Sequence, residues 1–334
     1  MNENIKKILK IVLFFAIGII IFWWVYKDQD IDKIADSLKD ANWFWIAVSL
    51  ILALLSHLSR AIRWNLLINP LGYKPRTINS FFAIMILYLS NMAVPRSGEI
   101  ARCGTMNKYE KVPFAQLVGT VFIDRVFDFV VLFIMLGIVL LTQFPVVMKI
   151  LENNPEIIAR FENIFSSMSL VLLLAVGFIL FMLVLWLLRH KIKKTIIYLK
   201  IKEIIISVFQ GLKSVINMKK KGQFFFHTIF IWLMYFLMIY VCFYAFTPTK
   251  DLDLLTGLTV FVMASFGMVV PSPGGIGTWH FMVIQTLIIY NVPEIDASAF
   301  AFATHGSMTI FLIVAGAISF VLLPIVNKNN SKSN

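Results

Sequence analysis

Residues 91–102 read NMAVPRSGEIAR, and this stretch decides the fold that we expect for the chain. It ends an apolar segment, residues 81–94, that is only fourteen residues long, whereas a helix needs about 20 apolar residues to cross a bilayer. Pro95 lacks a backbone N–H and bends a helix, so we expect the segment to turn back before it has crossed. Because non-helical backbone at membrane depth persists only against protein or a water-filled cavity, this turn should line a cavity.

The composition is that of a multi-span membrane protein. Of the 334 residues, 59% are hydrophobic and 14% are charged, which is too apolar for a soluble domain of this length. Thirty Lys and Arg against 18 Asp and Glu give a net charge of +12. In such a chain this excess marks cytoplasmic loops and contact with anionic lipid, so we expect no nucleic-acid partner. Cys103 and Cys242 lie far apart without metal-ligand spacing, so we expect no disulfide, metal or other cofactor.

We expect six full transmembrane spans, at residues 11–26, 43–62, 114–141, 168–188, 224–246 and 299–324. Lysines precede the first span and an acidic loop follows it, which places the N-terminus inside. Trp43 and Trp45 suit the outer interface of the second span, and Arg60 and Arg63 suit the inner one.

The loop at residues 189–222 carries ten basic residues against the single acid Glu203. A full crossing by residues 81–94 would put this loop outside, against the tendency of basic loops to remain cytoplasmic. Re-entry places it inside, with both termini cytoplasmic. Its apolar residues Ile205, Phe209, Leu212 and Ile216 recur at helical spacing, which predicts an amphipathic helix on anionic inner-leaflet lipid; a solvated loop is the alternative.

A second interruption, PSPGGIG at residues 271–277, separates apolar segments 254–270 and 278–290. The residues that break the helix here are Pro271, Pro273, Gly274, Gly275 and Gly277. Because prolines and glycines at this density cannot continue a helix, we expect a second hairpin that enters from the outside.

The sequence therefore predicts an all-α polytopic membrane protein with six full transmembrane helices and two re-entrant broken helix hairpins. The order span, span, hairpin, span occurs twice in opposite directions, in halves at about residues 8–142 and 166–325 of one membrane domain, residues 1–329. A polar tail occupies residues 327–334. Paired interruptions in inverted halves point to a transport site near the midplane.

The third span contains three charges, Asp124, Arg125 and Asp128. Charges in membrane segments cost roughly 2.5 to 3.5 kcal/mol each, so they are usually paired or functional. Helical spacing places Asp128 one turn from both other residues. Two interpretations stay open: a structural bridge that fastens this span to the first hairpin, or an arginine that is partly free to bind a lipid phosphate.

After the first break come Arg96, Glu99 and Arg102, and the last two share a helical face. Arginine binds phosphate in a bidentate way, and a helix that starts near Gly98 offers free N–H groups to an anion. An arginine cluster that only sets topology is the alternative. His280 and His305 lie in apolar surroundings and are read first as packing residues.

These three motifs, PRSGEIAR at residues 95–102, DRVFD at 124–128 and PSPGGIG at 271–277, together resemble the flippase-like transmembrane region of lysylphosphatidylglycerol synthases and its stand-alone relatives. The resemblance covers nearly the whole chain. It implies a plasma-membrane protein with two re-entrant hairpins that moves a lipid between leaflets. Substrates suggested within the family are aminoacylated phosphatidylglycerol and polyprenyl-phosphate-linked glycans.

Residue by residue, the resemblance implies substrate binding by Arg96, Glu99, Arg102, Asp124, Arg125, Asp128 and His280. It implies that the hairpins are shaped by Asn91, Pro95, Gly98, Pro271, Pro273, Gly274, Gly275 and Gly277. Relatives often carry an acid where this chain has His280, and its loss weakens the case for a cationic headgroup. We expect the soluble aminoacyl-transfer domain of the longer relatives to be absent.

Three functions follow as hypotheses. The first is a lipid transporter without enzymatic activity, the second a scaffold that recruits a lipid-modifying enzyme, and the third a headgroup-modifying enzyme with Glu99 or His280 as general base. The expected partners are a membrane lipid as substrate and, if the chain forms a homo-oligomer, a second copy.

Overall fold

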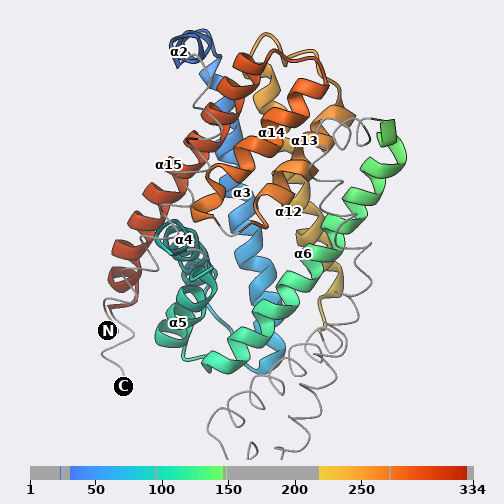
Figure 1. The fold of residues 1–334 in the computed structure, drawn as a ribbon. Coiled ribbons are helices and arrows are strands. Elements are labelled where there is room, and N and C mark those ends of the chain that lie inside the picture. Colours follow the sequence, from blue (N-terminus) through green and yellow to red (C-terminus); the bar gives the residue numbers. More distant parts are fainter. Residues whose placement is uncertain are drawn as a thin grey trace, which may run out of the picture.

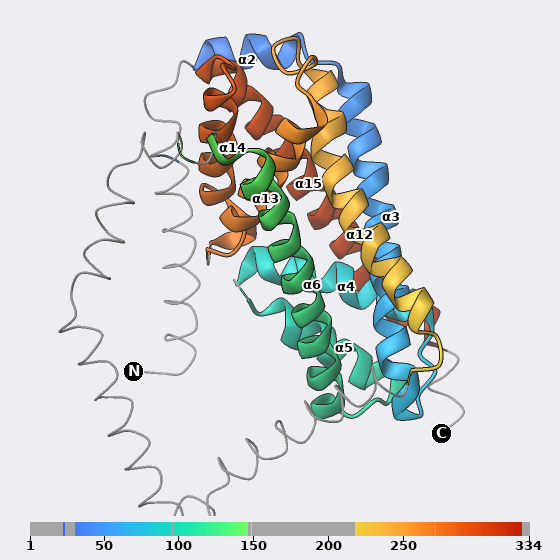
Figure 2. The ribbon, with the colours of Figure 1, turned by 90° about the vertical axis from the view of Figure 1, so that its right-hand side faces the viewer.

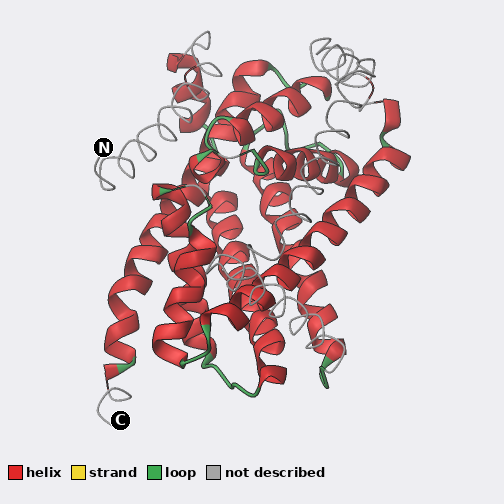
Figure 3. Ribbon diagram, turned by 60° about the horizontal axis from the view of Figure 1, so that its bottom comes forward, coloured by secondary structure: helices red, strands yellow, loops and turns green. Residues whose placement is uncertain are grey.

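The computed structural model describes Trp23 and residues 31–94, 96–145, 148, 218–270 and 272–328. In these ranges all regular secondary structure is helical (Figure 3), as predicted. The span expected at residues 168–188, and that at residues 11–26 apart from Trp23, lie outside the described residues. So do Pro95, Pro271, the amphipathic segment of the basic loop and most of the polar tail.

Four helices are long and apolar enough to cross a membrane: α3 (Trp43–Ile68), α6 (Phe114–Thr142), α12 (Lys221–Cys242) and α15 (Glu294–Val326). They coincide with the remaining four expected spans. The second span was expected to end at residue 62, but α3 continues to Ile68. This extension matters for the site, because it places Arg60 and Arg63 inside the helix instead of at its end.

The short helix α2 (Ile31–Lys39) lies across one end of the molecule (Figure 2). The Ser37 hydroxyl donates to the Asp296 carboxylate over 3.1 Å, which ties α2 to the start of α15. At the same end, the Asn42 N–H donates to the Ala245 carbonyl beyond α12. This end therefore gathers the beginnings of α3 and α15 and the end of α12.

The first hairpin consists of α4 (Thr77–Ala93) and α5 (Gly98–Glu110), which pack against each other in opposite directions. At its open end, the Glu110 carboxylate accepts from the Asn79 amide over 2.6 Å. The side-chain amides of Asn79 and Asn327, beyond α15, also donate to each other through two hydrogen bonds of 2.9 Å. The open end of this hairpin thus lies beside the end of α15, opposite to α2.

The second hairpin consists of α13 (Leu254–Gly267) and α14 (Thr278–Ile289), with the 3-10 turn η3 (Pro273–Gly275) between them. Asp253 begins α13, and its carboxylate accepts from the Thr256 N–H over 2.8 Å, which satisfies one of the unpaired donors of a helix start. α14 leads directly to the start of α15. The second hairpin therefore opens toward the end where α2 lies.

The tips of the two hairpins meet in the middle of the molecule (Figures 1 and 2). The Arg96 guanidinium on the first tip donates to the Val269 carbonyl on the second over 3.1 Å. Gly274 packs against the Met92 side chain of the first tip. Two pairs of short helices thus extend from opposite ends of the molecule and touch at their tips.

The first tip is closed by Asn91 and Gly98. The Gly98 N–H donates to the Asn91 side-chain oxygen over 2.8 Å, and a Cβ on Gly98 would lie only 2.7 Å from that oxygen. Glycine is therefore needed because the two helices approach closely. In the second tip the need is conformational: Gly274, Gly275 and Gly277 have φ values of 58°, 82° and 85°, which side chains disfavour.

Candidate functional site

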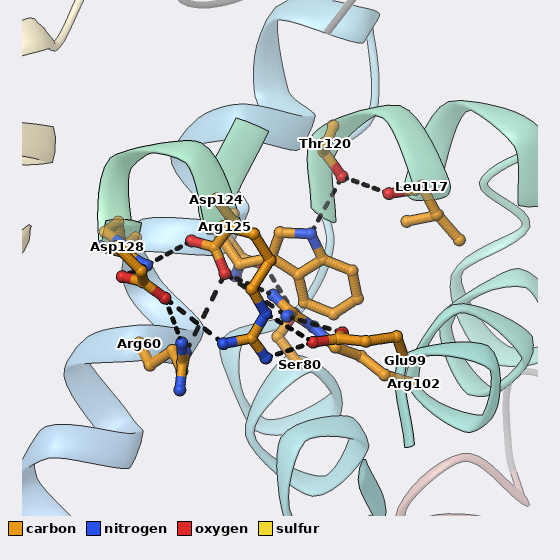
Figure 4. Close-up of polar contacts among 12 residues, drawn as sticks. Arg60, Ser80, Glu99, Arg102, Leu117, Thr120, Asp124, Arg125 and Asp128 are labelled. Atoms are coloured by element: carbon orange, nitrogen blue, oxygen red, sulfur yellow. Dashed lines mark hydrogen bonds and ion pairs between the residues drawn. The ribbon is translucent and has the colours of Figure 1, made fainter. Parts of the chain in front are cut away.

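A cluster of four arginines and three carboxylates joins α3, α5 and α6 (Figure 4). Its members are Arg60 and Arg63 from α3, Glu99 and Arg102 from α5, and Asp124, Arg125 and Asp128 from α6.

The two aspartates of α6 lie one turn apart and both face α3. The terminal Nη2 of Arg63 lies 2.6 Å from Asp124 and 2.8 Å from Asp128. Arg60 bonds directly to Asp128, and Arg125 lies 3.4 Å from the same carboxylate. Helical periodicity explains this arrangement, because residues at i and i+4 share a face.

Arg102 fastens the first hairpin to α6. Its guanidinium lies 3.3 Å from Glu99 and 3.3 Å from Asp124. The guanidinium carbon also lies 3.7 Å from the centre of the Trp64 ring, and the indole N–H of Trp64 donates to Thr120 of α6 over 2.9 Å. This is the structural bridge considered from the sequence.

Each carboxylate of the cluster is paired with at least one arginine, whereas positive charge remains in excess. Four guanidiniums face three carboxylates, which leaves one positive charge over. The side chains of Arg63, Arg102 and Asp124 are wholly buried, but that of Arg125 is 36% exposed. The excess charge is therefore most accessible at Arg125, which also bonds directly to Glu99.

A cavity of about 470 Å³ lies between the two hairpin tips and reaches this cluster. Arg60, Arg125 and Asp128 form its charged end. Its other polar lining residues are Ser49, His57, Tyr88, Asn91, Tyr235, Ser265, Thr304, His305 and Thr309. Apolar and aromatic side chains complete the wall, among them Phe129, Trp232, Phe261 and Trp279. A concave, mostly apolar pocket with a few convergent polar groups is typical of a ligand site.

Both hairpin tips contribute to the cavity wall. Asn91 and Met92 come from the first tip, and Met268 and Gly274 come from the second. The imidazole Nε2 of His305 lies 3.0 Å from the Gly274 carbonyl, which connects the second tip to α15. The sequence-based expectation that the broken segments line a cavity agrees with this placement.

The structure brings together five of the seven side chains predicted to bind substrate: Glu99, Arg102, Asp124, Arg125 and Asp128. Of these, Arg125 and Asp128 line the cavity, while Arg102 and Asp124 are enclosed behind it.

Arg96 and His280 lie elsewhere. Arg96 is on the hairpin tip, with its guanidinium on Val269. His280 is buried in the second hairpin, where its Nδ1 accepts from the Gly277 N–H over 3.3 Å and its ring lies 4.6 Å from that of His305. Neither residue lines the cavity.

The sequence placed Arg60 and Arg63 at the inner membrane interface, and it did not predict that both would be enclosed by other helices. They are 5% and 0% exposed and belong to the interior cluster. Four of the five residues that follow Arg63, at positions 64–68, are apolar, and they were the signal that the helix continues. His57, one turn before Arg60, was given no role from the sequence, yet it lines the cavity.

Among the described residues, no group of three or more His, Cys, Asp or Glu side chains is arranged to hold a metal ion.

Comparisons with known proteins assign the chain to a family of membrane proteins. A family model described as the lysylphosphatidylglycerol synthase TM region matches residues 8–316. The chain is also similar to UPF0104 membrane protein MJ1595 of Methanocaldococcus jannaschii, with 23% identity over 95% of this chain and 96% of the relative. No solved structure matches the chain.

Proposed function

Because the chain belongs to the family of the lysylphosphatidylglycerol synthase transmembrane region, and is a multi-pass membrane protein, we propose that it is a lipid transporter. It moves a phospholipid or a polyprenyl-phosphate-linked lipid between the leaflets of the plasma membrane. The proposal assigns no enzymatic step to the protein.

One observation carries this proposal: the cavity between the two hairpin tips ends on a cluster with one excess positive charge. A phosphate that leaves water needs a charged partner, since an unpaired charge in a low-dielectric interior is very costly. Arginine supplies this partner with two parallel N–H donors. The apolar remainder of the wall suits a headgroup whose acyl chains stay in the surrounding lipid.

We propose that the protein lies in the membrane with six full spans and two re-entrant hairpins in inverted halves. The end that holds Asn327 and the open side of the first hairpin faces the cytoplasm, together with both termini and the basic loop. The end that holds α2 faces outside. Each hairpin is then open to the water on its own side of the membrane, and its tip reaches the cavity. The contact between Arg96 and Val269 at the tips separates the water on the two sides.

The substitution Arg125→Gln tests the proposal and leaves the other ion pairs of the cluster in place. Glu99 keeps Arg102 at 3.3 Å, and Asp128 keeps Arg60 and Arg63, so no carboxylate loses its last partner. The excess charge at the cavity is lost. Because a hydrogen bond to a charged group contributes about 1.5–3 kcal/mol, and 1.4 kcal/mol is a factor of ten, we expect exchange to slow by about 10- to 100-fold.

Exchange is measured in proteoliposomes with lipids that are fluorescently labelled on an acyl chain, by chemical quenching of the outer leaflet. Lys108→Gln, an exposed position on α5, is the matched control and should exchange at the unchanged rate. Equal rates for wild-type protein, Arg125→Gln and empty liposomes would overturn the proposal. In that case recruitment of a partner enzyme, or a change in the mass of lipid incubated with the protein, would favour the scaffold or the enzyme.

A further inference from the structure

The charged groups of the cavity restrict the headgroup that it can hold. Among the described residues that line the cavity, Asp128 is the one carboxylate. Arg60, Arg63 and Arg125 already surround it. A headgroup ammonium would therefore find no unpaired carboxylate on this wall, whereas a phosphodiester would find the excess positive charge at Arg125.

His57 is a polar cavity residue that the fold leaves unpaired. It is 3% exposed, and neither ring nitrogen has a hydrogen-bond partner among the described residues. His57 lies on α3, one turn before Arg60. The centre of its ring lies 4.6 Å from the centre of the Tyr88 ring. Buried side-chain polar atoms without any partner are uncommon in folded proteins, so each requires an explanation.

Trp232 on α12 is a second such residue on the same wall. It is 8% exposed and lines the cavity, and its indole N–H has no partner within the part of the chain that the structure describes. The Tyr235 ring lies between the two, 6.3 Å from Trp232 and 6.3 Å from His57.

The two tyrosines connect this wall to the charged end of the cavity. A terminal nitrogen of Arg60 donates to the Tyr88 hydroxyl over 2.9 Å and to the Tyr235 hydroxyl over 3.0 Å. The unpaired groups of His57 and Trp232 therefore belong to a wall that the two tyrosines connect to Arg60, at the charged end of the cavity.

The chemistry of these groups matches hydroxyls. A neutral imidazole offers one donor and one acceptor, an indole offers one donor, and a hydroxyl both donates and accepts. The ring nitrogens of His57 and Trp232 are buried in this structure, so contact requires each ring to turn toward the ligand. No hydrogen bond to a described residue has to break for this rotation.

We propose that the transported headgroup is a phosphodiester whose substituent carries hydroxyls and no ammonium, and that His57 and Trp232 bind those hydroxyls. The inference rests on the proposed lipid transport and names the substrate class of the same site.

Three lipids with identical acyl chains test it: phosphatidylglycerol, phosphatidylethanol and phosphatidylethanolamine. The first two carry the same charge and differ in hydroxyls, and the third adds an ammonium. Each is present as a trace acyl-labelled probe in neutral proteoliposomes, and exchange is followed by quenching. We expect phosphatidylglycerol to exchange fastest, ahead of phosphatidylethanol by about two- to tenfold, the value of a net hydrogen bond. Phosphatidylethanolamine should be slowest.

His57→Phe keeps an aromatic ring and removes both nitrogens, and Trp232→Phe removes the indole N–H. Each should reduce the advantage of phosphatidylglycerol over phosphatidylethanol. His227→Phe is the matched control, because His227 bonds Ser59 at 2.8 Å on the same α3–α12 interface but does not line the cavity. It should keep the full preference.

The outcomes separate this inference from the proposed function. If no probe exchanges faster than in empty liposomes, the proposal of phospholipid transport fails and the inference with it. If phosphatidylethanolamine exchanges as fast as phosphatidylglycerol, transport stands and the inference is wrong. Equal slowing of phosphatidylglycerol and phosphatidylethanol by both His57→Phe and Trp232→Phe would show that these residues only support packing, which also overturns the inference.

Discussion

The Arg102 guanidinium on α5 lies 3.3 Å from the Asp124 carboxylate on α6, and neither side chain is exposed. This pair joins the first hairpin to a helix of membrane-spanning length. Its energy depends on its neighbours, because removal of charges from water costs several kcal/mol per ion and only a complete set of partners offsets that cost.

Asp124→Asn should therefore destabilise the fold strongly. The substitution leaves Arg63 and Arg102 facing a neutral amide in a buried site, and a broken buried pair typically costs about 3–5 kcal/mol. Thermal unfolding of the detergent-solubilised protein should show a clear decrease in Tm.

Asp36→Asn provides the control for this prediction. Asp36 pairs with Lys39 over 2.8 Å, but both side chains are largely exposed, at 68% and 75%. Exposed pairs contribute little to stability, so Tm should remain unchanged. Equal Tm values for both variants and the wild type would contradict the view that Asp124 holds the cluster together.

Gly98→Ala should weaken the closure of the first hairpin. The added methyl would meet the Asn91 amide and the Leu87 carbonyl, and overpacking of this kind costs about 1–3 kcal/mol. Gly104→Ala on the same helix is the matched comparison, since a Cβ there meets no atom within 4 Å.

Alanine favours a helix over glycine by up to about 1 kcal/mol, so Gly104→Ala should raise Tm while Gly98→Ala lowers it. Tm in detergent decides between them. If both substitutions shift Tm in the same direction, the close approach at Gly98 does not control stability.

Single cysteines should show that each hairpin returns to the side from which it entered. Both native cysteines are buried, and Lys74, Lys108, Lys250 and Glu294 occupy exposed positions at the open ends of the hairpins. In intact cells, a membrane-impermeant maleimide should label Lys250→Cys and Glu294→Cys. Lys74→Cys and Lys108→Cys should react only after the membrane is permeabilised. Labelling of the two members of one pair from opposite sides would mean that this segment crosses the membrane.

Much of the fold could be predicted because the length of an apolar segment and the residues that break a helix are local signals. Pro95 and Gly98 mark the first break, and the glycines after Pro273 mark the second. The described helices begin and end close to these residues. The end of α3 was less predictable. Arg60 and Arg63, one turn apart, indicate a membrane interface as long as their partners on other helices are unknown.

The site was predictable only in part, for a similar reason. Asp124, Arg125 and Asp128 were identified because they interrupt an apolar span. Their partnership with Arg60 and Arg63 depends on the packing of α3 against α6, which no spacing within one helix reveals. Arg96 belongs to the same motif as Glu99, but the chain reverses between them, at a φ of 63° for Arg96. One residue therefore lies on the tip and the other in the cluster.

The division of the cluster between α3 and α6 also affects how the protein is made. Arg60 and Arg63 leave the ribosome some sixty residues before Asp124 and Asp128. During that interval each arginine costs roughly 2.5–3.5 kcal/mol at the centre of a membrane helix. Until the aspartates are synthesised, both arginines lack these carboxylate partners. Delayed release of α3 from the insertion machinery would avoid this cost, so we expect α3 and α6 to be integrated together.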